Sequence, residues 1–175
     1  MVSKAQVMAL AVGDGWLDQG ANILLFGPPG GGKSHLAAAL GLALVQNGRR
    51  VRFIRTTDLV QRLQAAGREL GLEAAITKLD KYQLLILETS PTSSRIRPRP
   101  SVLFELIATR YERRSLLITA SQPFGEWGKI FADQAMTLAA IDRLVHHATI
   151  LEMNLESYRR RAALQRKRGK TVQPS

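Results

Sequence analysis

One stretch of the sequence decides the fold: Gly27-Pro28-Pro29-Gly30-Gly31-Gly32-Lys33-Ser34. It matches the pattern G-x-x-x-x-G-K-[ST] and lies between a short apolar run at 22–26 and an Ala- and Leu-rich run at 34–46. These runs are typical of a buried strand and of a helix, which is the context that a phosphate-binding loop needs. Glycines let such a loop turn tightly, so that successive backbone N–H groups point inward around an anion.

Two side chains of this loop have specific predicted roles. Lys33 supplies a positive charge for the β- and γ-phosphates of a nucleotide, and the Ser34 hydroxyl is the expected Mg²⁺ ligand. The helix that begins near Lys33 adds the positive end of its dipole. We therefore predict a nucleotide-binding site made of Gly27, Pro28, Pro29, Gly30, Gly31, Gly32, Lys33, Ser34 and His35.

A phosphate-binding loop of this type also needs an acidic partner at the end of a neighbouring strand. The apolar run 84–87 ends in Glu88, which is followed by Thr89. We predict that Glu88 holds Mg²⁺ through water and takes part in catalysis. A hydrolysing site usually has two adjacent acids, and Thr89 has no carboxylate with which to act as a general base. Nucleotide binding is thus predicted, whereas hydrolysis stays open.

The same alternation of strand and helix continues along the chain. Five apolar runs separated by helices predict an α/β fold, namely a P-loop NTPase with a five-stranded, mostly parallel sheet and helices on both faces. We expect an entry helix and linker at 1–20, a nucleotide-binding core at 21–155 and a basic helix and tail at 156–175. The expected strands are 22–26, 51–54, 84–87, 116–119 and 148–151, and the expected helices are 4–18, 34–46, 57–66, 70–81, 101–112, 134–147 and 155–168.

Composition narrows the function classes. The 175 residues include no cysteine, which excludes a disulfide framework and any cysteine-based metal site or nucleophile. No apolar run approaches the roughly 18–20 residues of a membrane span, and no secretory signal is visible, so we expect a cytoplasmic protein without a membrane partner. The 25 Lys and Arg exceed the 14 Asp and Glu by eleven, which favours a polyanionic partner.

The positive charge is concentrated in clusters. One comprises Arg49, Arg50, Arg52 and Arg55, and a second lies at 95–99. The densest is at the C-terminal end, where a DNA-binding arm and a plain solvated end are about equally compatible with the pattern. The DNA-binding candidates there are Arg159, Arg160, Arg161, Arg166, Lys167 and Arg168.

Two further groups of residues are not expected to form sites. His146 and His147 lack a partner at metal-ligand spacing. Phe124, Trp127 and Phe131 are predicted to pack in the interior rather than to stack on bases.

Several segments together resemble the IstB-like family, the AAA+ ATP-binding helper proteins of insertion-sequence transposition, which are related to the DnaC helicase loaders. The resemblance extends from about residue 3 to residue 168. It is carried by GPPGGGKSHLAAALGLAL, RTTDLVQRLQ, KLDKYQLLIL, SVLFELIATRYERRSLLITASQPFGEW and MTLAAIDRLVHHATI.

The resemblance implies ATP and Mg²⁺ as cofactors, and DNA, the transposase of the same element and further copies of the chain as partners. It also implies that Arg143, in AIDRL, is the arginine finger that reaches a neighbouring subunit's nucleotide, where its charge suits a developing phosphate charge. The alternative for Arg143 is a helix-surface arginine.

The chain departs from the family pattern in three places. Family members have a further N-terminal region, so we expect a truncated form. Ser121 stands where the family usually has Asn, and Glu88-Thr89 begins a segment that replaces an Asp-Asp loop. Three functions stay open: an active ATPase that helps transposition, a module that binds ATP with little turnover, and an inert remnant of a mobile element. A helicase loader is a variant of the first.

We hypothesise that two compensating frameshifts produced the segment from about Glu88 to Pro100. When GAC GAC CTC GCC TAC GTC, one spelling of Asp-Asp-Leu-Ala-Tyr-Val, loses one base of its first codon, it reads as the ETSPTS found here. About five of the eleven positive charges would then be a by-product of the shift. Sequencing the gene tests this hypothesis, which fails if no change of frame at these codons restores an Asp-Asp loop.

Overall fold

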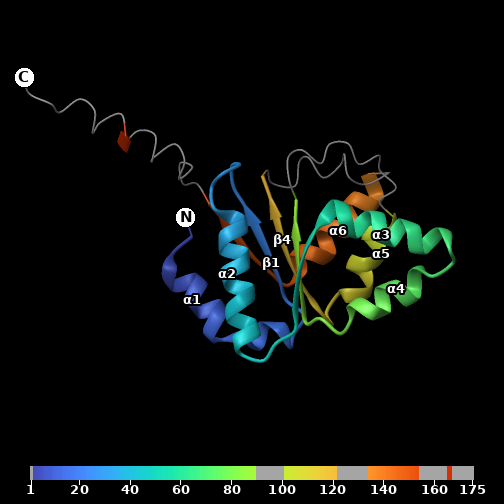
Figure 1. Cartoon of the computed structure of the whole chain (residues 1–175), viewed down its shortest axis with the longest axis horizontal. Coiled ribbons are helices and arrows are strands. Elements are labelled where there is room, and N and C mark those ends of the chain that lie inside the picture. The colour runs from blue at the N-terminus through green and yellow to red at the C-terminus, as the bar shows by residue number, and fades with distance from the viewer. Residues whose placement is uncertain (1, 90–100, 122–133, 154–164, 167–175) are drawn as a thin grey trace, which may run out of the picture.

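The computed structural model of the chain describes residues 2–89, 101–121, 134–153 and 165–166. Helices and strands alternate along the described residues (Figure 1). In chain order the elements are α1 (Lys4–Val12), the 3₁₀ turn η1 (Asp14–Leu17), β1 (Asn22–Phe26), α2 (Lys33–Gln46), β2 (Val51–Arg55), α3 (Thr56–Arg68), α4 (Leu72–Leu79), β3 (Leu84–Glu88), α5 (Ser101–Arg110), β4 (Ser115–Ala120), α6 (Gln134–His146) and β5 (Ala148–Glu152).

The five strands form one parallel sheet in the order β2-β3-β4-β1-β5. Helices α1 and α2 cover one face of the sheet, and α3, α4, α5 and α6 cover the other (Figure 1). The predicted α/β class, with a five-stranded parallel sheet between two helical layers, is confirmed.

Strand β1 shows why these apolar runs form central strands. All five of its residues are buried. Ile23 and Leu25 pack in the cluster beneath α2, whereas Leu24 and Phe26 pack on the opposite side, in the cluster shared with α3, α5 and α6. A strand that is covered on both faces needs apolar side chains at successive positions rather than at alternate ones.

The predicted N-terminal helix 4–18 is wrong in its extent. Helix α1 ends at Val12 and is followed by the short turn η1. Gly13 occupies the C-terminal cap, and its N–H donates to the Ala9 carbonyl oxygen at 2.9 Å. The chain then turns so that Asp14 and Asp18 both bind the guanidinium of Arg49, at 2.9 and 2.7 Å. One member of the predicted basic cluster is therefore neutralised within the fold.

Several sequence predictions fall outside the described residues. These are the packing roles of Phe124, Trp127 and Phe131, the frameshift segment beyond Thr89, and most of the C-terminal helix 155–168 with Arg159, Arg160, Arg161, Lys167 and Arg168. Arg166 is described as a helical, exposed residue. Within the described part of the chain, no helix is both long and apolar enough to cross a membrane.

Candidate nucleotide-binding site

The glycine-rich loop connects the carboxyl end of β1 to the start of α2. In open α/β sheets, ligands bind outside the carboxyl ends of the strands, where crossover connections diverge. Gly30 and Gly32 have φ angles of +75° and +87°, which strain any residue with a side chain. These two glycines allow the loop to turn sharply between β1 and α2.

The first residue of the loop is held between two strands. Gly27 N–H donates to the Ala120 carbonyl of β4 at 3.2 Å, and Met153 N–H donates to the Phe26 carbonyl at 2.7 Å. A Cβ atom on Gly27 would lie 2.6 Å from the Met153 carbonyl oxygen. The close approach of the chain after β5 therefore requires glycine at this position.

Lys33 is folded back into the loop. The residue is 8% exposed, and its Nζ donates to the carbonyl oxygens of Gly27 at 2.6 Å and Pro28 at 2.9 Å. Burial lowers the pKa of Lys33, and the charge of Glu88 opposes that shift. A phosphate anion bound in the loop would offer this buried ammonium a stronger, charged partner.

The two predicted Mg²⁺ ligands lie together. Ser34, in the first turn of α2, donates its hydroxyl hydrogen to the Glu88 carboxylate at the end of β3. The two residues are 54 positions apart in sequence and meet because β3 and β1 end at the same edge of the sheet. A hydroxyl and a carboxylate are hard oxygen donors, which is the ligand type that Mg²⁺ prefers.

Beyond Glu88 the edge is occupied by hydroxyl groups. The Oγ1 atoms of Thr89 and Thr56 lie 3.0 Å apart, and Thr89 N–H donates to the Thr119 carbonyl oxygen at 3.1 Å. Thr56 and Thr119 are buried and were not predicted as site residues. The available signal was their position, because Thr119 ends a predicted strand and Thr56 lies two residues after the end of another. Their hydroxyls cannot replace the carboxylate of a general base.

Ser121 follows β4 at the same edge. Its Oγ atom is buried and has no hydrogen-bond partner within the described part of the chain. A buried polar atom without a partner is costly in a native protein, and such atoms are often found at functional sites. Ser121, which stands where the family usually has Asn, thus lies at the same edge as Glu88 and Thr89 but has a short side chain.

The remaining predicted site residues lie elsewhere. His35 is exposed on the first turn of α2. Arg143, on α6, donates to the Ala139 carbonyl oxygen at 3.1 Å, and its guanidinium lies 5.3 Å from the ring centre of Phe104 on α5. These contacts hold Arg143 against its own helix and against α5. Within the single described chain, neither contact brings Arg143 to Lys33.

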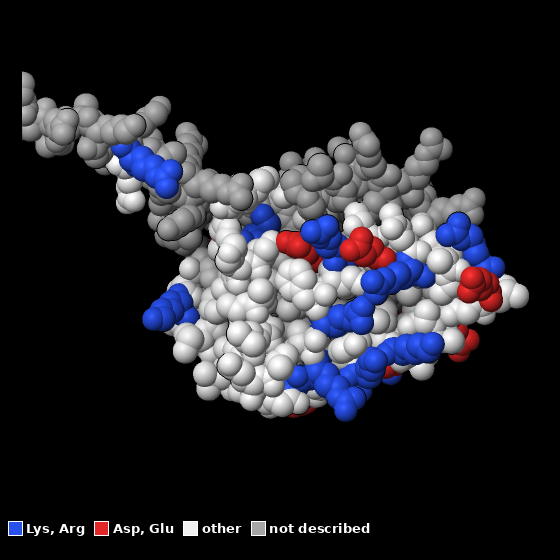
Figure 2. Space-filling view, viewed as in Figure 1, with Lys and Arg blue, Asp and Glu red and all other residues white. Residues whose placement is uncertain are grey.

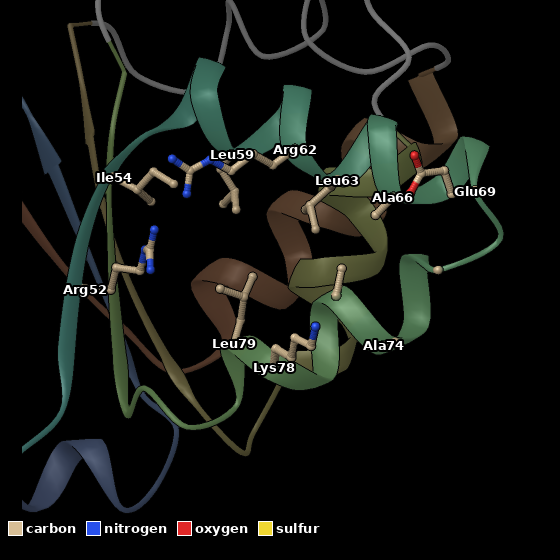
Figure 3. Close-up of a pocket in the computed structure, with 12 residues that line it drawn as sticks. Arg52, Ile54, Leu59, Arg62, Leu63, Ala66, Glu69, Ala74, Lys78 and Leu79 are labelled. Atoms are coloured by element: carbon tan, nitrogen blue, oxygen red, sulfur yellow. The ribbon is translucent and has the colours of Figure 1, made fainter.

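A second hollow lies between β2, α3 and α4 (Figure 3). Leu59 and Leu63 of α3 and Leu79 of α4 line it with apolar side chains. Its charged lining residues are Arg52, Arg62, Lys78 and Glu69. Charged side chains gather over this half of the visible face, where basic ones are the more numerous and acidic ones lie among them, whereas the half that carries α1 and α2 is mostly uncharged (Figure 2). The described structure therefore carries basic side chains around this pocket as well as at Arg166.

Comparison with known proteins agrees with this geometry. Residues 2–166 match the model of the IstB-like ATP-binding protein family. The chain is 71% identical over 168 residues to a putative insertion sequence ATP-binding protein of Sinorhizobium fredii, and this match covers 96% of the chain and 56% of the relative. It is 37% identical to the IS21 putative ATP-binding protein of Pseudomonas aeruginosa, over 90% of the chain and 59% of that relative. The chain thus spans little more than half the length of these relatives.

Solved structures share the fold at low sequence identity. DnaI superimposes with a TM-score of 0.66 at 15% identity, covering 90% of this chain and 86% of DnaI. DnaA from Aquifex aeolicus, solved with AMPPCP bound, has a TM-score of 0.65 at 18% identity, covering all of this chain and 55% of DnaA. The glycine-rich loop, the parallel sheet order and the family match lead to one conclusion: the chain belongs to the IstB-like ATP-binding protein family of insertion sequences and has the AAA+ P-loop fold.

Proposed function

We propose that this chain is an ATP-dependent helper of insertion-sequence transposition that binds ATP with Mg²⁺, binds DNA and regulates the transposase of the same element. The observation that carries the proposal is the meeting of Lys33, Ser34 and Glu88 at one glycine-rich loop. The names of its insertion-sequence relatives, which describe ATP-binding proteins, support the same assignment.

In the proposed complex the loop's N–H groups and Lys33 bind the nucleotide phosphates. Lys33 exchanges its bonds to the Gly27 and Pro28 carbonyls for bonds to phosphate oxygens, and the dipole of α2 favours the same anion. Ser34 and Glu88 separate from each other and hold Mg²⁺, directly or through water. When bound, the metal neutralises charge on the phosphates.

We propose further that ATP turnover by this chain is slow. Glu88 is the proposed Mg²⁺ ligand and is therefore not free to act as a general base. The next residue, Thr89, offers only a hydroxyl, which lies close to that of Thr56. No second carboxylate follows Glu88 in the strand to take a proton from the attacking water. ATP then acts mainly as a bound ligand that stabilises one conformation of the protein. Hydrolysis only rarely ends that ATP-bound state.

Assembly is the proposed role of Arg143. Its side chain is half-buried against Phe104 but remains on the surface of α6, from which an arginine can extend toward a neighbouring copy. In a homo-oligomer that finger would approach the neighbour's nucleotide and stabilise charge on its phosphates.

DNA binding is proposed to use two basic regions. The first region is the C-terminal tail, in which the described residue Arg166 is exposed. The second is formed by Arg52, Arg62 and Lys78 around the pocket between α3 and α4. Lysine and arginine side chains bind the DNA backbone by releasing its counterions, so no particular base sequence is required.

Substitution Lys33→Ala should lower ATP affinity at least about 100-fold in titration calorimetry, because it removes two or more charge-assisted hydrogen bonds to phosphate. Lys81→Ala, at an exposed lysine beside Tyr82, is the matched control and should bind ATP like the wild type. Wild-type affinity in Lys33→Ala would place the nucleotide somewhere other than this loop.

Substitution Thr89→Asp should raise the steady-state ATPase rate at least about tenfold, because it supplies a general base beside Glu88. Thr89→Asn has the same shape without the carboxylate, so it should leave the rate unchanged. An equal gain in both variants would show that loss of the Thr56 contact, rather than a base, limits turnover. If neither variant gains activity, the slow step depends on another residue, and Ser121→Asn is the next variant to test.

The double substitution Arg52→Gln and Arg62→Gln should weaken DNA binding and reduce the slope of log K against log salt by about 2, because two phosphate contacts are lost. Lys4→Gln, on α1, is the control on the mostly uncharged half of the molecule. The tail is tested separately by replacing Arg166, Lys167 and Arg168 with Gln. The DNA assignment fails if neither set of substitutions changes binding measured by fluorescence anisotropy.

A further inference from the structure

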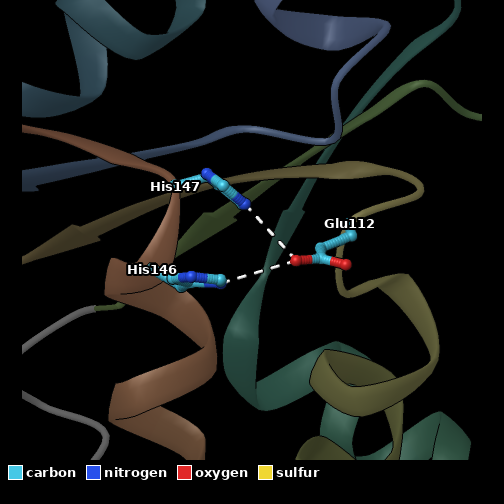
Figure 4. Close-up of side chains that lie close together, drawn as sticks. All are labelled: Glu112, His146 and His147. Atoms are coloured by element: carbon cyan, nitrogen blue, oxygen red, sulfur yellow. Dashed lines mark hydrogen bonds and ion pairs between the residues drawn. The ribbon is translucent and has the colours of Figure 1, made fainter.

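Three potential metal ligands meet at the edge of the sheet opposite the glycine-rich loop. His146 ends α6, His147 precedes β5, and Glu112 lies in the turn between α5 and β4 (Figure 4). His146 Nδ1 and His147 Nε2 lie 3.5 and 3.3 Å from the same carboxylate oxygen of Glu112. Among the described residues, this is the one group of three or more His, Cys, Asp and Glu side chains that converges closely enough to hold an ion.

These separations fit one small cation. Donor atoms bound to a tetrahedral ion at about 2.1 Å lie about 3.4 Å from one another. The two measured nitrogen–oxygen distances are close to that value, and the three ligand atoms all lie within 4.8 Å of each other. The side chains are half-exposed, at 53%, 50% and 50%, so an ion and its remaining water ligands can reach them from solvent.

Asn22, a buried residue at the start of β1, joins β4, which follows the turn of Glu112, to the segment that carries the two histidines. Its backbone N–H donates to the His147 carbonyl at 2.7 Å, and its side-chain Nδ2 donates to the Leu144 carbonyl at 3.1 Å. Its Oδ1 accepts from Leu116 N–H of β4 at 2.9 Å. The backbone on both sides of the cluster is therefore fixed before any ion binds.

Glu112 itself is held in an unusual conformation. Its φ angle is +57°, in the left-handed region that residues other than glycine seldom adopt. Gly20 lies against this turn, since a Cβ atom on it would be 2.6 Å from Glu112 C. The turn is anchored further by Arg110, whose buried guanidinium donates to the Tyr82 and Ser115 carbonyls, each at 2.9 Å. Strained residues of this kind are concentrated at functional sites.

Tyr111 contacts the proposed ligand atom of His146. Its hydroxyl is hydrogen-bonded to His146 Nδ1, and the two rings are stacked with centroids 5.7 Å apart. A cation bound at Nδ1 would take the lone pair that the Tyr111 hydroxyl now contacts, so this hydroxyl would have to turn to another acceptor when the ion binds.

We propose that Glu112, His146 and His147 form a binding site for a divalent transition-metal cation of the Zn²⁺ type. Two imidazoles and one carboxylate are a ligand set that zinc and its first-row neighbours accept, whereas Mg²⁺ and Ca²⁺ prefer oxygen ligands alone. Bound there, the cation ties the end of α6 to the turn after α5. Because α6 carries Arg143, the site would stabilise the helix that presents the proposed finger.

The test is a calorimetric titration of Zn²⁺ into the full chain, prepared without an affinity tag because polyhistidine binds zinc. We expect one zinc per chain and a higher midpoint of thermal unfolding in its presence. Glu112→Gln and His147→Asn should each lower zinc affinity at least about tenfold and abolish the thermal shift. Mg²⁺ titrated in the same way should give no thermal shift.

Two controls keep the result interpretable. Glu73→Gln removes an exposed carboxylate on α4, and His35→Asn removes the third of the chain's three histidines, so both should bind zinc like the wild type. Should one ligand variant fail to fold, His146→Asn and the visible absorption bands of bound Co²⁺ replace it. The proposal is overturned if the wild type binds no zinc, or if the ligand variants bind it as tightly as the controls.

Discussion

The pairing of β1 with β4 on one side and β5 on the other is the constraint on which the rest of the structure depends. At its carboxyl end this pairing holds the first residue of the glycine-rich loop between Ala120 and Met153. At its amino end Asn22 is hydrogen-bonded to Leu116 of β4 and to Leu144 and His147, which precede β5. A single buried strand thus positions both the proposed phosphate site and the proposed metal site.

The fold could be predicted from the sequence because its strands and helices follow from local patterns of apolar residues. Three apolar runs buried on both faces, β1, β3 and β4, and two partly exposed edge strands, β2 and β5, alternate with helices along the chain. This pattern leaves few arrangements other than a parallel sheet between helical layers. The glycine-rich loop was predicted for the same reason, since its spacing and flanking elements lie within about 25 residues. The boundary error at α1 arose where a glycine cap ended a helix that the apolar pattern continued.

What the sequence could not predict depends on strand order. The order β2-β3-β4-β1-β5 places Glu88 beside Thr119 and brings Thr56 to Thr89, and local patterns do not contain that order. The convergence of Glu112 with His146 and His147 was missed for the same reason, because β1 must first lie between β4 and β5. The net charge of +11 was also a weak indicator of a polyanionic partner. Arg49 is paired with two aspartates within the fold, and Arg110 is buried among backbone carbonyl oxygens.

The central claim is that Lys33, Ser34 and Glu88 make a site that binds ATP and turns it over slowly. The most direct test measures ATP affinity by calorimetry and steady-state hydrolysis on one preparation of the wild type, with Mg²⁺ and with DNA present. The account predicts saturable, Mg²⁺-dependent binding with hydrolysis far below the typical enzyme rate of about 10 s⁻¹. Absence of ATP binding, or hydrolysis near that rate with Thr89 in place, would contradict it.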